Sequence, residues 1–420
     1  MTEVNKKKHI AVLGAGIVGI NCAVELQSLG YQVTLIDKGE IGEGCSKANA
    51  GHFATEQVFP LAEPSILLQL PKMLLDPLGP IALSPTHFPK ALPWLLKFMG
   101  NMFISKRNKN TQALKSLNQD AINYYKPLLK SADAEHLLTE KGSLLVYERT
   151  PIDKIKKQHE AYLTQGVKVK LLDRQQTLLL EPNLHKNIQH ALYFTDVAHT
   201  IDPLALSQKL ADYSQKLGCK FKHFTVKKIT HHADFVAVSD DKSALEFDHL
   251  VIATGAWSES LLNQLNYRLP IEAERGYSLD LSQKTLHQLS RPVASAERRF
   301  IITPMSHGLR LAGTVEFAGL QQKANMKRAK MLHKNAQFII ADLPQLSEDD
   351  GQGWLGFRPS LPDSLPVICQ APHHQNITFA VGHQHLGLTL GAITGKLVGQ
   401  IISNQKTDVD ISPFCISRFN

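Results

Sequence analysis

Cysteine is scarce in this chain. The 420 residues include five cysteines that lie far apart and form no C-x-x-C pair: Cys22, Cys45, Cys219, Cys369 and Cys415. An odd number of distant cysteines does not suggest a disulfide framework, and the missing pairs argue against a zinc cage. We therefore expect neither disulfides nor a structural metal, and a protein that works in a reducing compartment.

The sequence also lacks internal repeats, low-complexity segments and long hydrophobic runs. No apolar stretch reaches the roughly 18 residues that a transmembrane helix needs. Hydrophobic residues make up 43% and charged residues 20% of the chain. That composition is typical of a folded globular protein, and the length predicts two or three domains.

Basic residues outnumber acidic ones without forming a nucleic-acid binding stripe. Lysine and arginine total 46 against 38 aspartate and glutamate, a formal net charge of +8. Such an excess suits an anionic partner. The basic residues are scattered, however, and no stacking aromatic residues alternate with them. We do not expect nucleic acid among the partners.

One apolar segment, 58–103, is interrupted by eight prolines, from Pro60 to Pro93. Prolines prevent one long helix and favour short helices and turns. The favoured interpretation is a packed excursion of a second domain. The alternative is an amphipathic patch on an anionic bilayer, because basic residues follow at 106–109. The sequence thus predicts a cytoplasmic protein and leaves open peripheral contact with the inner face of the cell membrane.

The N-terminal region contains a glycine-rich turn between a strand and a helix. An apolar strand at 10–13 leads into Gly14-Ala15-Gly16-Ile17-Val18-Gly19, and a helical pattern covers 20–29. A second apolar strand at 32–36 ends in Asp37. Lysines precede the first strand as in a secretory signal, but the glycines and the amphipathic helix favour the start of a mature fold.

This arrangement predicts a dinucleotide site. Gly14 makes the tight turn, Gly16 leaves the backbone open to a pyrophosphate, and Gly19 lets the helix approach the strand. The helix N-terminus offers free N–H groups and a partial positive charge. Asp37 lies 18 residues after Gly19, where its carboxylate can bind an adenosine ribose and disfavours a 2′-phosphate. The motif alone leaves NAD and FAD open.

Other segments supply the rest of a cofactor site. A loop of small and polar residues follows Asp37, a strand at 219–229 carries Val226, and a buried strand at 248–253 ends in a tight turn. Residues 381–391 precede a helix expected at about 392–402, whose N-terminus would stabilise negative charge on a reduced flavin ring. The candidate cofactor contacts in these segments are Lys38, Cys45, Ser46, Asn49, Ala50, Gly51, Val226, Thr254, Gly255, Trp257, Gly382, His383, Gly387, Leu388 and Thr389.

The order of five motifs then suggests a family. They are G-x-G-x-x-G with Asp37, S-x-x-N-A-G from Ser46, A-T-G-A-W-S from Ala253, G-x-R-P-x-x-P-D from Gly356 and G-H-x-x-x-G from Gly382. Together they span nearly the whole chain. This combination resembles the FAD-dependent D-amino-acid oxidase and dehydrogenase superfamily, and is most similar to its bacterial D-amino-acid dehydrogenase branch of small-subunit type.

The resemblance implies FAD and an α/β fold. A Rossmann-like FAD-binding domain of mostly parallel sheet would be joined to an α+β substrate domain with a large antiparallel sheet. We place the discontinuous FAD-binding domain at 1–60, 195–260 and 355–420, and the substrate domain at 61–194 and 261–354. Cys45 matches no covalent attachment pattern, so we expect FAD to be bound noncovalently.

The resemblance also assigns a role to Arg358, because the arginine of the G-x-R-P motif binds the substrate carboxylate in the family. A guanidinium can hold a carboxylate through two parallel hydrogen bonds. The alternatives are an ion pair with Asp363 or the capping of a turn. Tyr277 is a second candidate for the carboxylate, or else a sheet residue whose hydroxyl lies in water.

Two histidines complete the predicted substrate site. His52 follows the S-x-x-N-A-G loop and His385 lies in the turn expected to cover the flavin. Each is either a contact of flavin or substrate, or a structural residue. No carboxylate or cysteine accompanies them at ligand spacing, so we expect no metal site.

The sequence therefore predicts a D-amino-acid dehydrogenase. It would oxidise a D-amino or D-imino acid to the imino or 2-oxo acid by hydride transfer to FAD, and pass the electrons to a quinone or another carrier. Narrower alternatives are a D-proline or cis-4-hydroxy-D-proline dehydrogenase and a glycine or sarcosine oxidase. A noncatalytic flavin-binding subunit or redox sensor is a different class, which Arg358 argues against because a sensor has no use for a carboxylate clamp.

Overall fold

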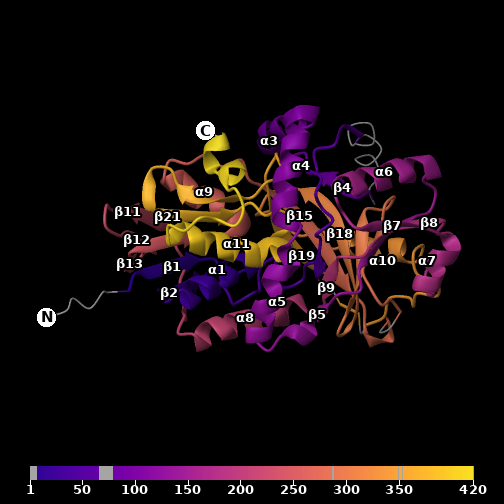
Figure 1. Cartoon of the computed structure of the whole chain (residues 1–420), viewed down its shortest axis with the longest axis horizontal. Helices are drawn as coiled ribbons and strands as arrows, with labels where there is room; N and C mark the ends of the chain where they lie inside the picture. Colours follow the sequence, from indigo (N-terminus) through magenta and orange to yellow (C-terminus); the bar gives the residue numbers. More distant parts are fainter. Residues whose placement is uncertain (1–6, 66–78, 286–287, 349, 352, 420) are drawn as a thin grey trace.

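Two large sheets lie side by side along the long axis of the molecule (Figure 1). The computed structural model describes residues 7–65, 79–285, 288–348, 350–351 and 353–419. The first sheet has the order β10-β2-β1-β14-β21-β20, and the second β19-β15-β18-β17-β16-β6-β8-β7 with β4 beside β18. The predicted α/β architecture, with a mainly antiparallel second sheet, is confirmed.

The first sheet is parallel except at one edge, where β20 pairs antiparallel to β21. Its central strands are almost entirely buried and apolar, as expected for a parallel sheet covered on both faces. The strands are β1 (His9–Leu13), β2 (Gln32–Asp37), β10 (Lys220–His223), β14 (His249–Ile252), β20 (Val367–Ala371) and β21 (His374–Val381).

Alternating side chains of β1 divide the core of this half. Ile10 and Val12 pack in the cluster that contains helices α1 (Ile17–Ser28), α5 (Ala121–Ser131), α8 (Pro203–Lys216) and α11 (Gly387–Ile402). Ala11 and Leu13 belong to the cluster on the opposite face. That face carries α9 (Ser258–Gln264) and the small sheet of β11 (Lys228–His231), β12 (Val236–Ser239) and β13 (Ala244–Phe247).

Within the described ranges, the second sheet has nine strands. Helices α7 (Arg174–Leu180) and α10 (Lys327–Ala336) border one of its apolar clusters, and α6 (Ile152–Thr164) borders another. The strands are β4 (Ile81–Leu83), β6 (Ser143–Tyr147), β7 (Val169–Asp173), β8 (His190–Phe194), β15 (Glu272–Asp280), β16 (Val293–Ser295), β17 (Phe300–Met305), β18 (Gly308–Phe317) and β19 (Trp354–Ser360). A further small sheet joins β3 (His52–Phe53), β9 (Ala198–Thr200) and β5 (Leu138–Thr139).

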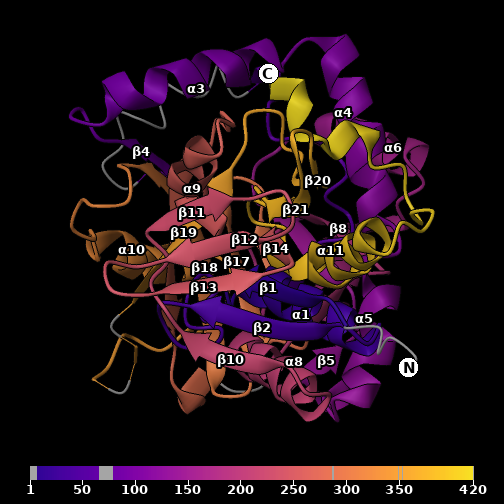
Figure 2. The same cartoon turned by 90° about the vertical axis from the view of Figure 1, so that its left-hand side faces the viewer.

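The proline-interrupted segment lies partly outside the described residues, which omit 66–78. Its described part contains α3 (Phe88–Gly100), a helix that continues through Pro93 and precedes α4 (Ile104–Asn118). Helix α3 runs along the outer edge of the molecule in both views (Figures 1 and 2), and its Trp94 is buried. In the part of the chain that the structure describes, no helix is long and apolar enough to cross a membrane.

Two predicted elements differ from the structure. The single strand expected at 219–229 is divided into β10 and β11, and Val226 lies in the irregular stretch between them. Helix α11 begins at Gly387, about five residues before the predicted start at 392. Its glycines are packing positions: a Cβ on Gly395 would lie 2.5 Å from the Asn21 carbonyl oxygen of α1. Close helix packing therefore outweighs the low helix propensity of glycine here.

The division of the chain into two domains stays a prediction. Strand β19, which carries Arg358, pairs with β15 in the nine-stranded sheet, although the predicted FAD-binding segment starts at 355.

Candidate active site

Two cavities meet between the sheets. The turn cavity, of about 490 Å³, is lined by 13–18, 37–40, 43–46, 224–226, 253–257 and 380–384. The sheet cavity, of about 450 Å³, is lined by strands β15 to β19 and by parts of 45–61 and 384–388. Both are lined by Ile17, Cys45, Ser46, Gln384 and Gly387, so one ligand could extend from the first into the second.

The glycine turn has the geometry that the motif predicts. Gly14 has a φ of +111°, and a Cβ there would lie 2.4 Å from the Ala253 carbonyl oxygen. A Cβ on Gly19 would lie 1.8 Å from the Gly14 carbonyl oxygen. At Gly16, by contrast, a Cβ would lie 3.5 Å from the Ser46 hydroxyl, and no other atom of the described residues lies within 4 Å of it. These contacts suit a backbone that a phosphate approaches closely.

Asp37 is fixed at the end of β2. Its Oδ2 accepts a hydrogen bond from the Ala15 amide at 2.7 Å, and its Oδ1 accepts one from the Gly39 amide at 2.9 Å. The Ser46 hydroxyl accepts from the Ile17 amide at 2.9 Å at the start of α1. The carboxylate therefore stays beside the glycine turn and on the wall of the turn cavity.

Most predicted cofactor residues come together at these cavities. The turn cavity is lined by Gly14, Ala15, Gly16, Ile17, Val18, Asp37, Lys38, Cys45, Ser46, Val226, Thr254, Gly255, Trp257, Gly382, His383 and Gly387. Asn49, Ala50 and Leu388 line the sheet cavity. Three residues line neither: Gly19 packs on the turn, the Thr389 hydroxyl accepts from the Ala54 amide, and Gly51 turns the chain with a φ of +65°.

The N-terminus of α11 is directed at the junction of the two cavities, because Gly387 lines both of them and Leu388 lines the sheet cavity. No side chain of the described part of the chain caps this end of the helix. Its free N–H groups and partial positive charge can therefore stabilise an anionic ring system at the junction. This supports the predicted role of the helix, although the helix begins earlier than expected.

Cys45 is a neutral thiol in this environment. Its Sγ donates to the Phe357 carbonyl oxygen at 2.7 Å, and burial raises its pKa to about 11. A protonated thiol is a poor nucleophile. Noncovalent cofactor binding stays a prediction, and the state of Cys45 favours it.

His383 and His385 are both neutral at physiological pH. His383 is buried against the Thr394 hydroxyl, 2.9 Å from its Nε2, and burial lowers its pKa to about 3. His385 faces the sheet cavity, yet the surrounding protein lowers its pKa to about 4 by burial. Neither imidazole therefore adds positive charge to the site at pH 7.

The buried His383 predicts acid sensitivity. The histidine of an unfolded chain has its ordinary pKa, about 6.5, whereas folded His383 has a pKa of about 3. The unfolded state therefore binds more protons between these pH values. The free energy of unfolding should fall with pH below about 6.5, and His383 should account for roughly 2–3 kcal/mol of the loss by pH ~4.5. Chemical denaturation at pH 7 and pH 4.5 measures this.

The variant H383N should lose that part of the pH dependence, whereas H136N, at an exposed histidine, should keep the full dependence. If the free energy of unfolding of H383N fell with pH as steeply as that of the unmodified protein, His383 would not be the source of this pH dependence.

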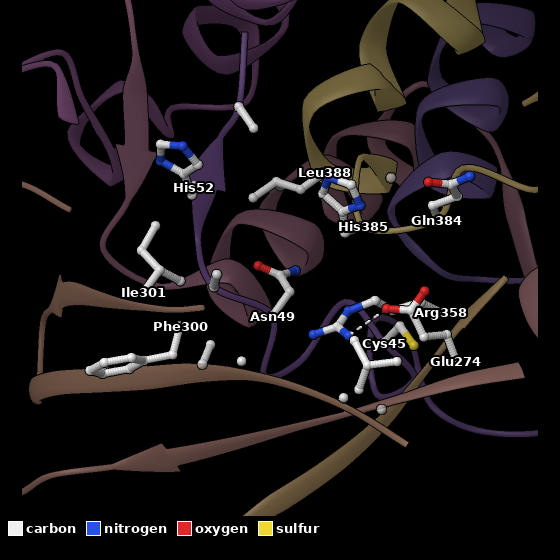
Figure 3. Close-up of a pocket in the computed structure, with 18 of the residues that line it drawn as sticks. Cys45, Asn49, His52, Glu274, Phe300, Ile301, Arg358, Gln384, His385 and Leu388 are labelled. Carbon is white, nitrogen blue, oxygen red and sulfur yellow. Dashed lines mark hydrogen bonds and ion pairs between the residues drawn. The ribbon is translucent and has the colours of Figure 1, made fainter. Parts of the chain in front are cut away.

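Arg358 lies in the sheet cavity on β19, with its side chain 24% exposed. Its Nη1 donates to Glu274 Oε1 at 3.0 Å and to the Thr314 carbonyl oxygen at 3.2 Å. Asp363, the alternative partner, pairs with Arg418 at 2.7 Å. Arg358 is therefore not engaged by Asp363, and Figure 3 shows its guanidinium beside Glu274 and Cys45 on the cavity wall.

Tyr277 also lines the sheet cavity, but its hydroxyl is engaged elsewhere. The hydroxyl donates to Glu316 Oε2 at 2.5 Å and accepts from the Asn325 amide at 3.0 Å. The residue is buried, with 1% of its surface exposed, so its hydroxyl does not lie in water. A role of Tyr277 at the substrate carboxylate stays a prediction. Of Tyr277 and Arg358, it is Arg358 whose polar group faces the cavity without being fully engaged by the protein.

His52 lies across the sheet cavity from Arg358 in Figure 3. Its Nε2 is 2.9 Å from Glu56 Oε1, and the His52 side chain is 11% exposed. His385 lines the same cavity, on the side of Leu388 (Figure 3). The structure thus brings all four predicted substrate-site residues to one cavity.

Several lining residues were not anticipated from the sequence. Among them are Glu56, Glu274, Trp354 and Gln384. Glu274 lies 84 positions before Arg358, and only the β15–β19 register places the two opposite each other. In the sequence, the one signal for Glu274 was its position just before the Arg275-Gly276-Tyr277 segment.

Comparisons with known proteins fit this geometry. A D-amino-acid oxidase of Bradyrhizobium diazoefficiens is 33% identical over 423 aligned residues, covering 98% of this chain and 99% of that protein. A D-amino acid dehydrogenase of Vibrio vulnificus strain YJ016 is 28% identical over 408 residues, covering 94% and 96%. Both alignments extend over nearly the full length of each protein.

Solved structures share the fold. Glycine oxidase from Geobacillus kaustophilus superposes with a TM-score of 0.73 at 20% identity, covering 98% of this chain and 99% of that one. L-proline dehydrogenase from P. horikoshii gives a TM-score of 0.74 at 18% identity, with 98% of both chains covered. The family model described as FAD dependent oxidoreductase matches residues 9–401. The chain therefore belongs to the FAD dependent oxidoreductase (DAO) family, and FAD is its cofactor.

Proposed function

We propose that this protein oxidises a D-amino or D-imino acid to the imino acid, which water hydrolyses to the 2-oxo acid. The observation that carries the proposal is a guanidinium, that of Arg358, on the wall of a cavity continuous with the dinucleotide site. A guanidinium of this kind binds and orients a carboxylate. The names of the D-amino-acid oxidase and dehydrogenase relatives support the substrate class and the D configuration.

FAD, when bound, supplies the acceptor for a hydride from the substrate Cα. Arg358 would hold the carboxylate and so direct the Cα–H bond, while the amine nitrogen, once neutral, uses its lone pair to form the C=N bond. Phe300, Ile301 and Leu388 line the cavity with apolar surface and limit the access of water. The neutral His385 does not repel a cationic amine that enters. The ammonium group of the substrate loses its proton to water before the hydride leaves, so the chain need not supply a separate general base.

A product assay tests the proposal. The FAD-loaded protein is incubated with a dye acceptor and with D-alanine, D-proline, cis-4-hydroxy-D-proline or sarcosine, and the 2-oxo acid or aldehyde is trapped with a carbonyl reagent. We expect a D-amino or D-imino acid to give product and its L-enantiomer to give none. Product from sarcosine alone would point instead to an oxidase for glycine-like amines, and no product from any amine would contradict the proposal.

We also propose that the electrons pass to a quinone or another carrier and that α3 lies on an anionic bilayer. Leu96 in α3 and Phe103, three residues after the helix ends at Gly100, are 55% and 68% exposed. No acidic residue occurs between 79 and 119, a segment that contains several lysines. An exposed apolar stripe flanked by positive charge is typical of an interfacial helix. Quinone turnover much faster than oxygen turnover would support the acceptor class.

Replacing this stripe with charge should weaken bilayer contact and leave the chemistry unchanged. Because burying each side chain contributes roughly 1.5–3 kcal/mol, L96E/F103E should bind phosphatidylglycerol vesicles at least about tenfold more weakly in sedimentation assays. Its turnover with a soluble dye should equal that of the unmodified protein. The matched control is L179E, at a leucine that is 84% exposed on α7. If both variants lost vesicle binding equally, or if L96E/F103E lost none, the proposed contact of α3 with the bilayer would be contradicted.

A further inference from the structure

The guanidinium of Arg358 is held from one side. Both recorded hydrogen bonds of its side chain leave from Nη1, to Glu274 Oε1 at 3.0 Å and to the Thr314 carbonyl oxygen at 3.2 Å. Among the described residues, no acceptor takes a hydrogen bond from Nη2 or Nε. In Figure 3 the dashed line to Glu274 meets one terminal nitrogen, and the other points away from Glu274. The edge formed by Nε and Nη2 is therefore available to a ligand.

Glu274 is itself fixed in place. The register of β15 and β19 sets it directly opposite Arg358. Its Oε2 accepts a hydrogen bond from the Ser360 hydroxyl at 2.7 Å, and its side chain is 9% exposed. Ser360 is held in turn, because the indole N–H of Trp94 on α3 donates to its carbonyl oxygen at 3.1 Å. A carboxylate bound by both oxygens cannot swing toward the substrate, so it fixes the direction of the arginine.

Thr314 adopts a strained conformation at this point. Its φ is +59°, in the left-handed region that β-branched residues rarely enter. The β15–β18 pairing shifts register between Arg275 and Tyr277, opposite Thr314. The Thr314 hydroxyl is buried and has no hydrogen-bond partner among the residues that the structure describes. Residues with backbone strain of this kind are concentrated at functional sites. Here the strained residue is the one whose carbonyl oxygen accepts from Arg358.

Gly276 provides the surface on which the guanidinium rests. A Cβ there would lie 2.4 Å from both Cζ and Nη2 of Arg358. Gly276 has no left-handed φ, so conformational freedom does not explain the glycine. The close approach of the guanidinium does.

We infer that Glu274, the Thr314 carbonyl and Gly276 form a positioning set for Arg358. Glu274 and the Thr314 carbonyl accept the hydrogen bonds of Nη1, and Gly276 lets the guanidinium plane lie close to the backbone. The Nε–Nη2 edge therefore faces the substrate carboxylate before the substrate binds. This rests on the carboxylate-binding role proposed for Arg358. Glu274 is thus a positioning residue and not a proton-transfer group.

A carboxylate with no amine to oxidise tests binding separately from chemistry. The FAD-loaded protein is titrated with propionate, and the Kd is read from the perturbed flavin absorbance. E274A and G276A should each weaken binding at least about tenfold, because an orientation error of about 1 Å can cost two orders of magnitude in a preorganised site. E274Q keeps an oxygen acceptor for Nη1 and should stay within about threefold of the unmodified protein. The ratio of flavin to protein absorbance should be unchanged in all three.

R358L separates the two claims. If R358L binds propionate as tightly as the unmodified protein, the proposed role of Arg358 fails. If R358L binds weakly while E274A and G276A bind normally, only the positioning set is overturned. E274Q as weak as E274A would also overturn it, because the acceptor oxygen alone would then not position the arginine. The double variant R358L/E274A should be no weaker than R358L, since Glu274 acts through Arg358.

Discussion

Replacing Arg358 with leucine should lower kcat/KM for the preferred substrate by about 10²–10⁴-fold. Two hydrogen bonds between a guanidinium and a carboxylate contribute roughly 1.5–3 kcal/mol each, and each ~1.4 kcal/mol of transition-state stabilisation is a factor of ten. FAD should stay bound, because Arg358 does not line the turn cavity. Steady-state kinetics and the flavin absorbance of the purified variant measure the two effects.

The variant R358K is the matched control, because it keeps a positive charge beside Glu274 but loses the planar fork. We expect the kcat/KM of R358K to lie between those of the unmodified protein and R358L, and most of the decrease to come from a higher KM. Unchanged kcat/KM in R358L, with full FAD content, would remove Arg358 from the substrate site. Loss of FAD in R358L would show instead that the residue supports the fold.

Alanine at two glycines of the turn should separate cofactor binding from folding. At Gly16 a Cβ has room within the protein, 3.5 Å from the nearest atom, Ser46 Oγ, so the apoprotein should unfold at the same temperature as the unmodified apoprotein. The methyl group would occupy the space through which the pyrophosphate approaches, so G16A should weaken FAD binding about 10–100-fold or more. Equilibrium titration of apoprotein with FAD measures this.

Gly19 should behave differently, because a Cβ there would lie 1.8 Å from the Gly14 carbonyl oxygen. The turn itself must move, so G19A should lose FAD and also about 3 kcal/mol of apoprotein stability. The control G100A adds a Cβ that has no atom of the described residues within 4 Å, and it should change neither property. A G16A variant with normal FAD affinity would contradict the placement of the pyrophosphate.

Local patterns predicted the glycine turn well. The apolar strand, the three glycines and Asp37 lie within about thirty residues, and their geometry depends mainly on short-range backbone constraints. The start of α11 was predicted too late because Gly387 and Gly391 have low helix propensity. A Cβ on Gly391 would lie 2.4 Å from the Tyr125 hydroxyl oxygen, so packing between distant helices favours glycine there.

The structure brings the predicted substrate-site residues to one cavity, but their pairings were not predicted. Arg358 was identified through a motif, whereas its partner Glu274 depends on the register of two strands that are distant in sequence. The partner of Tyr277 also depends on strand register, because its hydroxyl donates to Glu316 on the neighbouring strand β18. Such pairings follow from long-range strand order, which a single sequence does not specify.

The most direct test is anaerobic mixing of the FAD-loaded protein with D-alanine, D-proline, cis-4-hydroxy-D-proline, sarcosine and the L-enantiomers, with R358L in parallel. The flavin absorbance reports the arrival of the hydride without any added acceptor. We predict that at least one D-compound bleaches the flavin of the unmodified protein, that its L-enantiomer does not, and that R358L bleaches at least about a hundredfold more slowly. Absence of bleaching by every compound, or equal bleaching by both enantiomers, would contradict the account.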